Sequence, residues 1–265
     1  MTPSTMGSGN RPYNLIHLLL PPAFWLGAWQ LGAWLVEFRV QGRGNELLLP
    51  YPATVLAALL RLASASLFWK TVLASLLRIL VGMGVGTLLG AVLAVLTCLS
   101  PWCNRLLSGP IRVIRATPVA SFILLVLLWT DRSFVASVIS ALMVLPVVWA
   151  NLSRGIGETD PQLLELARAY RYSVPKTVTL IYFPSLRPYF LSAITTAMGL
   201  AWKSGVAAEV LCTPRNAIGT QIYNTKLYLE VPDLFAWTAV VVMLSLLLEG
   251  LLRLVLNRWS RGWTP

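Results

Sequence analysis

The chain alternates between long apolar runs and shorter polar segments. Six runs of mostly apolar residues are long enough for a helix to cross a bilayer, which takes about 20 residues, and the apolar residues in each are continuous. The strands of a membrane barrel would instead be about 10 residues long with polar residues at every second position. The pattern therefore predicts an all-α, polytopic membrane protein with about six transmembrane helices. The predicted spans are Leu15–Glu37, Thr71–Leu99, Ile111–Thr130, Phe134–Ala150, Phe190–Cys212 and Leu234–Leu256.

A long polar segment, residues 153–187, separates the fourth and fifth predicted spans. Asp160 can cap a helix, and Pro161 suits the first helical position because proline has a fixed φ and no N–H. A short helix is therefore expected from Pro161 to about Tyr172. The segment carries no nucleotide-binding motif and no grouping of acids or nucleophiles that would support catalysis. From the residues alone it is either a docking element or an ordinary amphipathic loop within one membrane domain, residues 1–265.

The composition also indicates a membrane protein, and in a membrane protein a high net positive charge has another explanation than it has in a soluble one. Hydrophobic residues make up 57% of the 265 residues, charged residues 12%, and the mean hydropathy is +0.70. A net charge of +11 would suggest a nucleic-acid partner in a soluble protein. Here the Lys and Arg residues fall mostly between the spans, so they report topology and no nucleic-acid partner is expected. Their distribution favours both termini on the cytoplasmic side, and no cluster of Cys and His predicts a metal.

Three glycines recur every four residues in the second predicted span. Gly82, Gly86 and Gly90 share one helix face, because residues four apart lie one above the other on a helix. Small residues at this spacing let the backbone of another membrane helix come close. We expect this face to be a packing surface.

Ionisable residues inside the spans are candidates for function, because charge is costly in the bilayer and such residues usually face a cavity or a partner. Arg78 lies in the second span, and Lys203 and Glu209 lie in the fifth, with Trp202 beside Lys203. Lys203 and Glu209 are six residues apart, so they project from different faces of their helix. Each of these four residues either lines a translocation pathway or belongs to a buried structural cluster. If Arg78 and Lys203 line the path, they favour an anionic solute.

The polar segment contains a Glu-x-Ala start, a turn position six residues after the Glu and, after nine intervening residues, an Ile-x-Phe-Pro end. This spacing resembles the cytoplasmic coupling segment of ABC-type importer permeases. The resemblance implies that the segment docks on an ATPase, with Glu165 and Arg168 in polar contacts, Ala167 allowing close approach, and Ile181 and Pro184 anchoring the segment. The matching positions are Glu165, Leu166, Ala167, Arg168, Arg171, Ile181 and Pro184.

The segment departs from the usual family pattern at three positions. Leu166 replaces an alanine, Phe183 replaces a leucine, and Arg171 replaces a glycine. Glycine allows a sharp turn with positive φ, which arginine tolerates poorly. The turn is therefore expected either to form differently or to be lost, with Arg171 prolonging the helix and contacting the ATPase.

Other parts of the chain resemble the nitrate, sulfonate and taurine branch of these permeases, notably residues 75–82 and 188–209. The resemblance implies a permease with the type I importer fold, in the bacterial cytoplasmic (inner) membrane. It also implies partners: a second permease copy, two ABC ATPase subunits that bind the ATP, and an extracytoplasmic substrate-binding protein. The chain itself is expected to need no cofactor and to carry no catalysis.

The expected solute is a small organic or inorganic anion, such as a sulfonate, taurine, nitrate or bicarbonate. Related permeases also import thiamine precursors, riboflavin-like compounds and other aromatic compounds, and the 11 tryptophans keep that alternative open. Two readings from other classes are an ATP-independent channel and a membrane-embedded enzyme. A channel would not need the coupling segment, and an enzyme would need a grouping of acids, ligands or nucleophiles near the membrane interface that the sequence lacks.

Overall fold

The computed structural model describes residues 15–40 and 47–261, and within them every regular element is a helix. The terminal segments 1–14 and 262–265, on which part of the topology prediction rests, lie outside the described residues. The elements are α1 (Leu15–Arg39), α3 (Pro52–Ser64), α4 (Ser66–Leu99), α5 (Pro101–Ala116), α6 (Val119–Leu127), α7 (Arg132–Gly157), α8 (Pro161–Ala169), α9 (Val174–Thr177), the π-helix η1 (Val178–Tyr182), α10 (Phe183–Cys212), α11 (Ile218–Leu227) and α12 (Val231–Arg261).

Three of the described helices are long and apolar enough to cross a membrane: α4, α7 and the Val231–Leu256 part of α12. Helices α5 and α6 pass the same test together as a fourth, broken span. Helices α1 and α10 also have the length of a span, with 25 and 30 residues. This all-helical membrane architecture confirms the predicted fold class, and it is compatible with six spans.

The third predicted span, Ile111–Thr130, is wrong as a single helix. Helix α5 ends at Ala116, α6 begins at Val119, and the two axes are bent by 106°. The cause lies in Thr117, because the residue before a proline is pushed out of the α region, and Thr117 precedes Pro118. Thr117 has φ −78° and ψ 134°, and its hydroxyl donates to the Val113 carbonyl at 2.8 Å.

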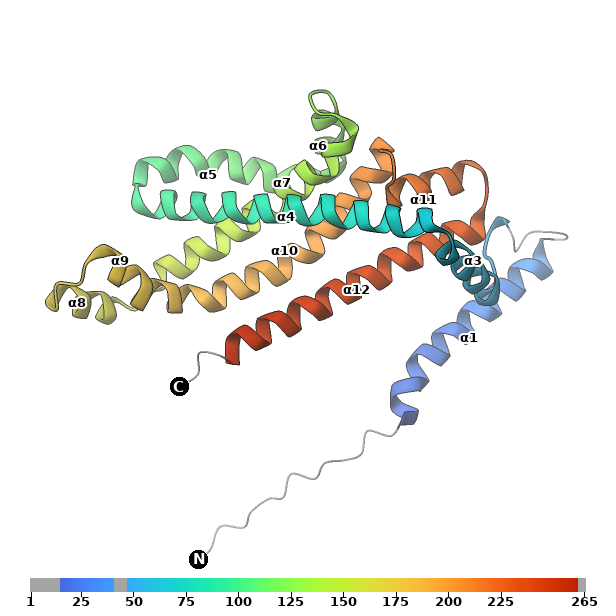
Figure 1. Ribbon diagram of the computed structural model, residues 1–265, viewed down its shortest axis with the longest axis horizontal. Coiled ribbons are helices and arrows are strands. Elements are labelled where there is room, and N and C mark those ends of the chain that lie inside the picture. The colour runs from blue at the N-terminus through green and yellow to red at the C-terminus, as the bar shows by residue number, and fades with distance from the viewer. Residues whose placement is uncertain (1–14, 41–46, 262–265) are drawn as a thin grey trace, which may run out of the picture.

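The core of the bundle is formed by α4, α7 and α10, which run side by side in Figure 1. Three of the four glycines of α4, namely Gly82, Gly86 and Gly90, face backbone carbonyls of α7. A Cβ on Gly86 would lie 2.5 Å from the Ala141 carbonyl oxygen, so this close contact admits only glycine. Gly82 and Gly90 meet the carbonyls of Ser137 and Leu145 in the same way, at 2.2 and 2.8 Å.

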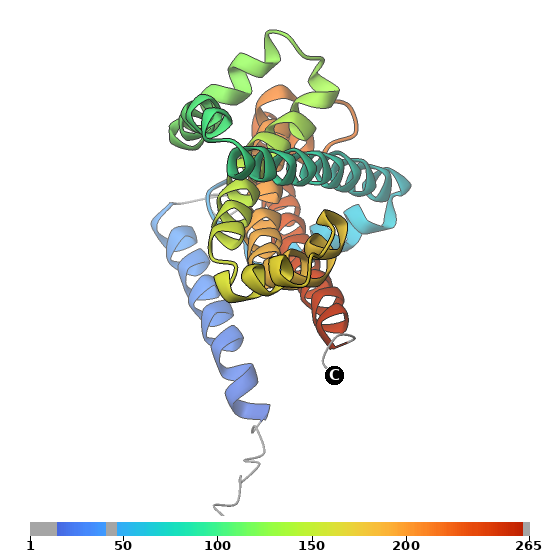
Figure 2. The same ribbon diagram turned by 90° about the vertical axis from the view of Figure 1, so that its left-hand side faces the viewer.

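The two ends of the bundle differ. At one end, helices α8 and α9 lie beyond the ends of α7 and α10, and α12 also ends on this side of the bundle (Figure 1). Viewed from that side, α8 and α9 cross the end of the bundle that faces the viewer (Figure 2). At the other end, α3 is tied to α12 by Arg61, whose Nη2 lies 2.5 Å from Oδ1 of Asp233. There α1 reaches the bundle through Trp29, whose Nε1 donates to the Pro50 carbonyl at 3.1 Å.

Candidate functional site

Helix α8 begins as the sequence predicts. Asp160 is its N-cap, and its Oδ1 accepts a hydrogen bond from the Gln162 backbone N–H at 2.8 Å. Pro161 occupies the first turn, where its missing N–H leaves no donor unsatisfied. The polar part between the two flanking helices runs from residue 158 to 182, because α7 continues to Gly157 and α10 begins at Phe183. The outer parts of the predicted segment 153–187 therefore belong to the bundle helices.

Helix α8 ends earlier than predicted, at Ala169 rather than Tyr172. Arg171 adopts a left-handed conformation with φ 52°. The N–H of Tyr172 bonds the Ala167 carbonyl at 2.8 Å, and the N–H of Arg171 bonds the Arg168 carbonyl at 3.0 Å. This pair of bonds is the Schellman motif that usually places glycine at the left-handed position. The expectation that Arg171 prolongs the helix is therefore wrong, because Arg171 takes the left-handed position of the turn that ends it.

The side chains of α8 divide into an outward face and one inward position. Glu165, Leu166 and Arg168 are exposed, whereas Ala167 is only 4% exposed. The methyl group of Ala167 lines a pocket of about 390 Å³ within the segment, with Arg171 among the other lining residues. The outward face thus offers one acid, one base and an apolar side chain between them.

The segment is continuous with α10 through a widened helical turn. The Phe183 N–H bonds the Val178 carbonyl, five residues back, which defines the π-helix η1. The next residue, Pro184, has no N–H and would disturb a regular α-helix, so the wider turn accommodates it. Ile181 is 6% exposed and packs inward, while Pro184 is exposed in the first turn of α10. A movement of α9 would therefore be passed directly to α10, and the turn at residues 170–173 joins α8 to α9.

A second attachment joins α10 to the end of α7. The Tyr189 hydroxyl donates to a carboxylate oxygen of Glu158. Gly155 lies against the ring of the same tyrosine, with a Cβ at that glycine 2.7 Å from Tyr189 Cδ2. The polar segment is thus held at both of its ends.

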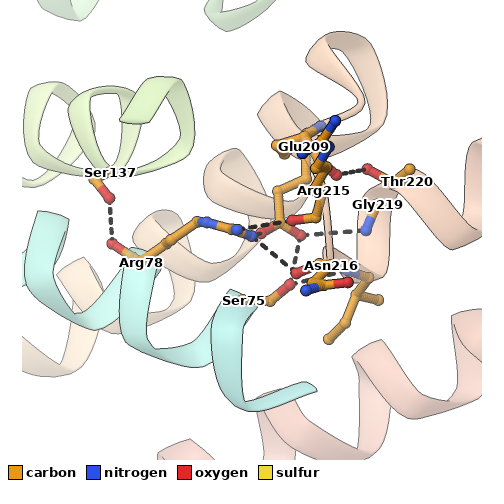
Figure 3. Close-up of polar contacts among 10 residues, drawn as sticks. Ser75, Arg78, Ser137, Glu209, Arg215, Asn216, Gly219 and Thr220 are labelled. Carbon is orange, nitrogen blue, oxygen red and sulfur yellow. Dashed lines mark hydrogen bonds and ion pairs between the residues drawn. The ribbon is translucent and has the colours of Figure 1, made fainter. Parts of the chain in front are cut away.

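Two of the charged groups inside the spans, Arg78 and Glu209, form a largely buried cluster near the opposite end of α10 (Figure 3). Glu209 is fully buried; its Oε2 accepts from Ser75 Oγ at 2.8 Å and from the Gly219 N–H at 3.2 Å. Its Oε1 lies 3.4 Å from Nη1 of Arg78. The Ser75 hydroxyl in turn accepts the Ile218 N–H at 2.9 Å. The carboxylate therefore ties α4, α10 and the start of α11 together.

Arg78 completes the cluster by holding the loop between α10 and α11. Its guanidinium donates to the carbonyls of Arg215 at 2.8 Å and Asn216 at 3.0 Å (Figure 3). Asn216 has a left-handed φ of 48°, and Thr213, at the end of α10, has 47°. The loop thus owes its shape to contacts with α4. The Arg78 backbone is itself contacted by α7, because its carbonyl accepts from Ser137 Oγ at 2.8 Å.

Trp202 and Lys203 are neighbours in sequence but differ in environment. Trp202 is 1% exposed, and its Nε1 donates to the Val241 carbonyl of α12 at 3.1 Å. Lys203 is exposed, and among the described residues it makes no ion pair and no hydrogen bond. Of the four pathway candidates, Arg78, Trp202 and Glu209 are engaged in internal contacts, and Lys203 is the one that faces outward.

Sequence reasoning missed the partners of Glu209. Ser75 and Arg78 are three residues apart, which places them on one face of α4, and this spacing was an available signal. The roles of Gly219 and of the carbonyls at 215 and 216 had no sequence signal. A Cβ on Gly219 would lie 2.4 Å from the Val210 nitrogen, so glycine is required there. Within residues 15–40 and 47–261, no three His, Cys, Asp or Glu side chains lie together as metal ligands would.

Comparison with known proteins points to one class. A family model described as the binding-protein-dependent transport system inner membrane component matches residues 86–261. The chain is 27% identical over 91% of its length to the Escherichia coli protein named as an aliphatic sulfonates transport permease, SsuC, and covers 89% of that protein. It is 25% identical to the E. coli taurine transport system permease protein TauC, over 81% of this chain and 80% of that one.

Two further comparisons extend over most of the chain. The bicarbonate transport system permease protein CmpB of Synechococcus elongatus is 25% identical over 98% of this chain and 96% of its own. A crystal structure of an amino acid ABC transporter with histidines superposes with a TM-score of 0.57 at 16% identity, over 80% of this chain and 95% of that chain. At that identity the likeness speaks for the fold alone. All of these proteins are transport components by name.

Proposed function

We propose, from the premise that this chain belongs to the family of binding-protein-dependent inner-membrane transport components, that α8 is the surface on which its ATPase partner docks. Membership makes the chain a multi-pass permease component of an ABC importer. Importers of this class work with an ATPase and a binding protein, so the chain supplies the path and its partner supplies ATP hydrolysis. The proposal concerns which residues join the two.

The observation that carries the proposal is the placement of α8. The helix lies across one end of the bundle and exposes Glu165, Leu166 and Arg168 (Figure 2). The Schellman turn at Arg171 and the buried Ile181 hold it rigidly. An ATPase subunit that binds this face can therefore rotate the whole bundle, because α8 does not give way as a flexible loop would.

The mechanism follows from the connection of α8 to α10. When the ATPase subunits close on ATP, they move α8, and the movement reaches α10 through the Schellman turn at Arg171, α9 and the π-turn. Because α10 packs on α4 and α7, the three helices move as one body. Rigid-body rocking of this kind in two permease copies exposes the path to each side of the membrane in turn.

Two copies of the chain and two ATPase subunits complete the proposed importer. The end of the bundle that carries α8 also carries the C-terminal end of α12 (Figure 1). Docking on α8 puts that end in the cytoplasm, with both termini inside. Arg154, Arg168 and Lys176 are exposed on the same side, as expected for a cytoplasmic face.

The proposed solute is a small anion. The three relatives are named for sulfonates, taurine and bicarbonate, each of which carries an acidic oxygen group. The exposed side chain of Lys203 in α10 supports the same choice, because an unpaired cation in a membrane helix favours a negatively charged ligand.

A charge reversal on α8 tests the docking role. Glu165→Lys is expected to insert and fold as the wild type does, because the side chain is exposed, but to abolish co-purification of the ATPase. Glu230→Lys is the matched control, because Glu230 is also exposed and lies at the far end of the bundle. Normal co-purification and solute uptake by the Glu165 variant would contradict the proposal.

A further inference from the structure

The exposed face of α10 differs from the exposed faces of α4 and α12 in the kind of side chain that it carries. Exposed positions on α4 and α12 carry large apolar side chains such as Leu77, Leu88 and Leu246. On α10, a stripe of small and polar residues recurs every three or four positions and spans about 80° of the helix surface. The α10 stripe consists of Ser192, Thr196, Gly199, Lys203 and Ala207, of which Gly199 is partly exposed and the others exposed.

Lys203 stands at the depth where a free charge is least favourable. It lies nine residues before the end of α10 at Cys212, or about 14 Å along the helix, which is near the middle of a hydrocarbon core of about 30 Å. The large apolar side chains exposed on α10 beyond its first turn, Leu200 and Leu211, lie at the edge of the stripe. A lysine at this depth requires water or a negative charge.

A carboxylate of α12 lies next to the stripe. A Cβ on Gly199 would be 3.9 Å from Oε1 of Glu249, so the acid sits one helical turn from Lys203. Side chains in a helix lean toward its N-terminus, which points the Lys203 side chain toward the turn of Gly199. Glu249 also lies 3.9 Å from Nη2 of Arg253. Two cations and one acid therefore share this region and leave it with a net positive charge.

We propose that Lys203 binds the acidic oxygen group of the transported solute, and that the α10 stripe lines the path. The missing side chain at Gly199 leaves space beside Lys203, and the hydroxyls of Thr196 and Ser192 continue the polar surface toward α8. Glu249 limits the net charge of the site and so favours a singly charged oxyanion, such as a carboxylate, sulfonate or bicarbonate. This inference rests on the proposed function, which supplies the path.

The reaction of an introduced cysteine tests the site without knowledge of the solute. In a background with Cys98, Cys103 and Cys212 replaced by serine, Thr196→Cys is placed in the assembled complex in lipid vesicles. An anionic ethylsulfonate methanethiosulfonate is expected to react about fivefold faster than its cationic trimethylammonium counterpart, because Lys203 attracts the first and repels the second. Lys203→Met in the same chain is expected to remove this preference.

Two results would overturn the proposal. If Thr196→Cys reacts no faster than Leu246→Cys, an exposed apolar position on α12, the stripe faces lipid or is covered by the second copy. If the preference for the anionic reagent persists in Lys203→Met, another group creates it. Failure of the wild-type chain to bind any ATPase would refute the proposed function instead, and the accessibility result would still report on the stripe.

Uptake supplies the second readout, with taurine, an alkanesulfonate and bicarbonate as probes. For the probe that the wild-type complex transports, Lys203→Met is expected to lower the uptake rate at least tenfold, while Lys203→Arg keeps the charge and most of the rate. Lys226→Met is the matched control, because Lys226 is exposed on α11, away from the stripe. Unchanged uptake in Lys203→Met would contradict the proposal, as would loss of the assembled complex in both Lys203 variants.

Discussion

At the residue scale, Glu209 shows how a charge can be kept inside a membrane protein. The carboxylate is fully buried and has a hydroxyl, a backbone N–H and a guanidinium as partners. A buried charge with this many donors is tolerated, whereas one that has lost its counter-ion is strongly unfavourable. Arg78 also holds two carbonyls of the 215–216 loop, so the pair helps to organise that loop.

Removing the cation of this pair should destabilise the protein. Arg78→Met leaves Glu209 buried without a counter-ion, and we expect a loss of about 3–5 kcal/mol in the free energy of unfolding. Thermal unfolding in detergent measures it. Arg253→Met is the matched control, because Arg253 and its partner Glu249 have side chains that are 69% and 39% exposed, and the loss of this pair should cost about 1 kcal/mol or less.

A double variant separates the charge from the packing. Arg78→Met combined with Glu209→Gln has no unpaired charge and should be more stable than Arg78→Met alone. If the double variant were the less stable of the two, the hydrogen bonds that the Glu209 carboxylate accepts from Ser75 and Gly219, and not the loss of its counter-ion, would dominate.

The left-handed conformation of Arg171 leads to a predicted stabilisation, whereas removal of Arg78 is predicted to destabilise the protein. Glycine takes this conformation without steric cost, whereas an L residue with a Cβ pays about 1–2 kcal/mol. Because glycine also gains freedom in the unfolded chain, Arg171→Gly should stabilise the α8 turn by up to about 1 kcal/mol. It should leave ATPase co-purification intact. A more stable variant that no longer binds the ATPase would assign the Arg171 side chain a direct contact.

At the element scale, the contact between α4 and α7 depends on the absence of side chains. Each of three glycines on α4 meets a carbonyl of α7 at a distance that no Cβ could occupy. Two helices this close cannot slide past each other without losing the fit between the glycines of α4 and the carbonyls of α7. The pair therefore forms the firm part of the bundle, against which α10 packs.

Glycine-to-alanine changes test this contact. Gly86→Ala should lower the melting temperature in detergent clearly, because the new methyl group would overlap the Ala141 carbonyl and overpacking of this kind costs about 1–3 kcal/mol. Gly84→Ala is the control on the same helix, since nothing lies within 4 Å of its Cβ position. Equal melting temperatures for the two variants would show that α4 and α7 are not in close contact.

At the scale of the whole molecule, the sequence could predict the class of the protein and the position of its polar segment. Apolar runs predict spans because the bilayer requires them, and Asp160 and Pro161 predict the start of α8 because capping is local. The break at Thr117 could also have been predicted, since Pro118 follows it. The prediction of a single span missed it because apolar residues continue on both sides of Thr117 and Pro118.

Other features could not be predicted because they depend on tertiary contacts. The left-handed Arg171 contradicts the preference of arginine, and it occurs in a turn that the N–H groups of Arg171 and Tyr172 close. The burial of Ala167 depends on how the rest of the segment packs around it. The sequence did not reveal that Arg78 is paired and that Lys203 is exposed, because a charge in a span does not show whether another helix supplies its partner.

The measurement that tests the central claim most directly is ATP hydrolysis by the reconstituted complex. The chain is assembled in lipid with an ATPase of its own organism and an external binding protein, and solutes are added singly. We expect a stable complex whose ATP hydrolysis rises with the loaded binding protein and one small anion, and falls to the unstimulated rate with Glu165→Lys. A chain that binds no ATPase, or stimulation that is unaffected by Glu165→Lys, would contradict the account.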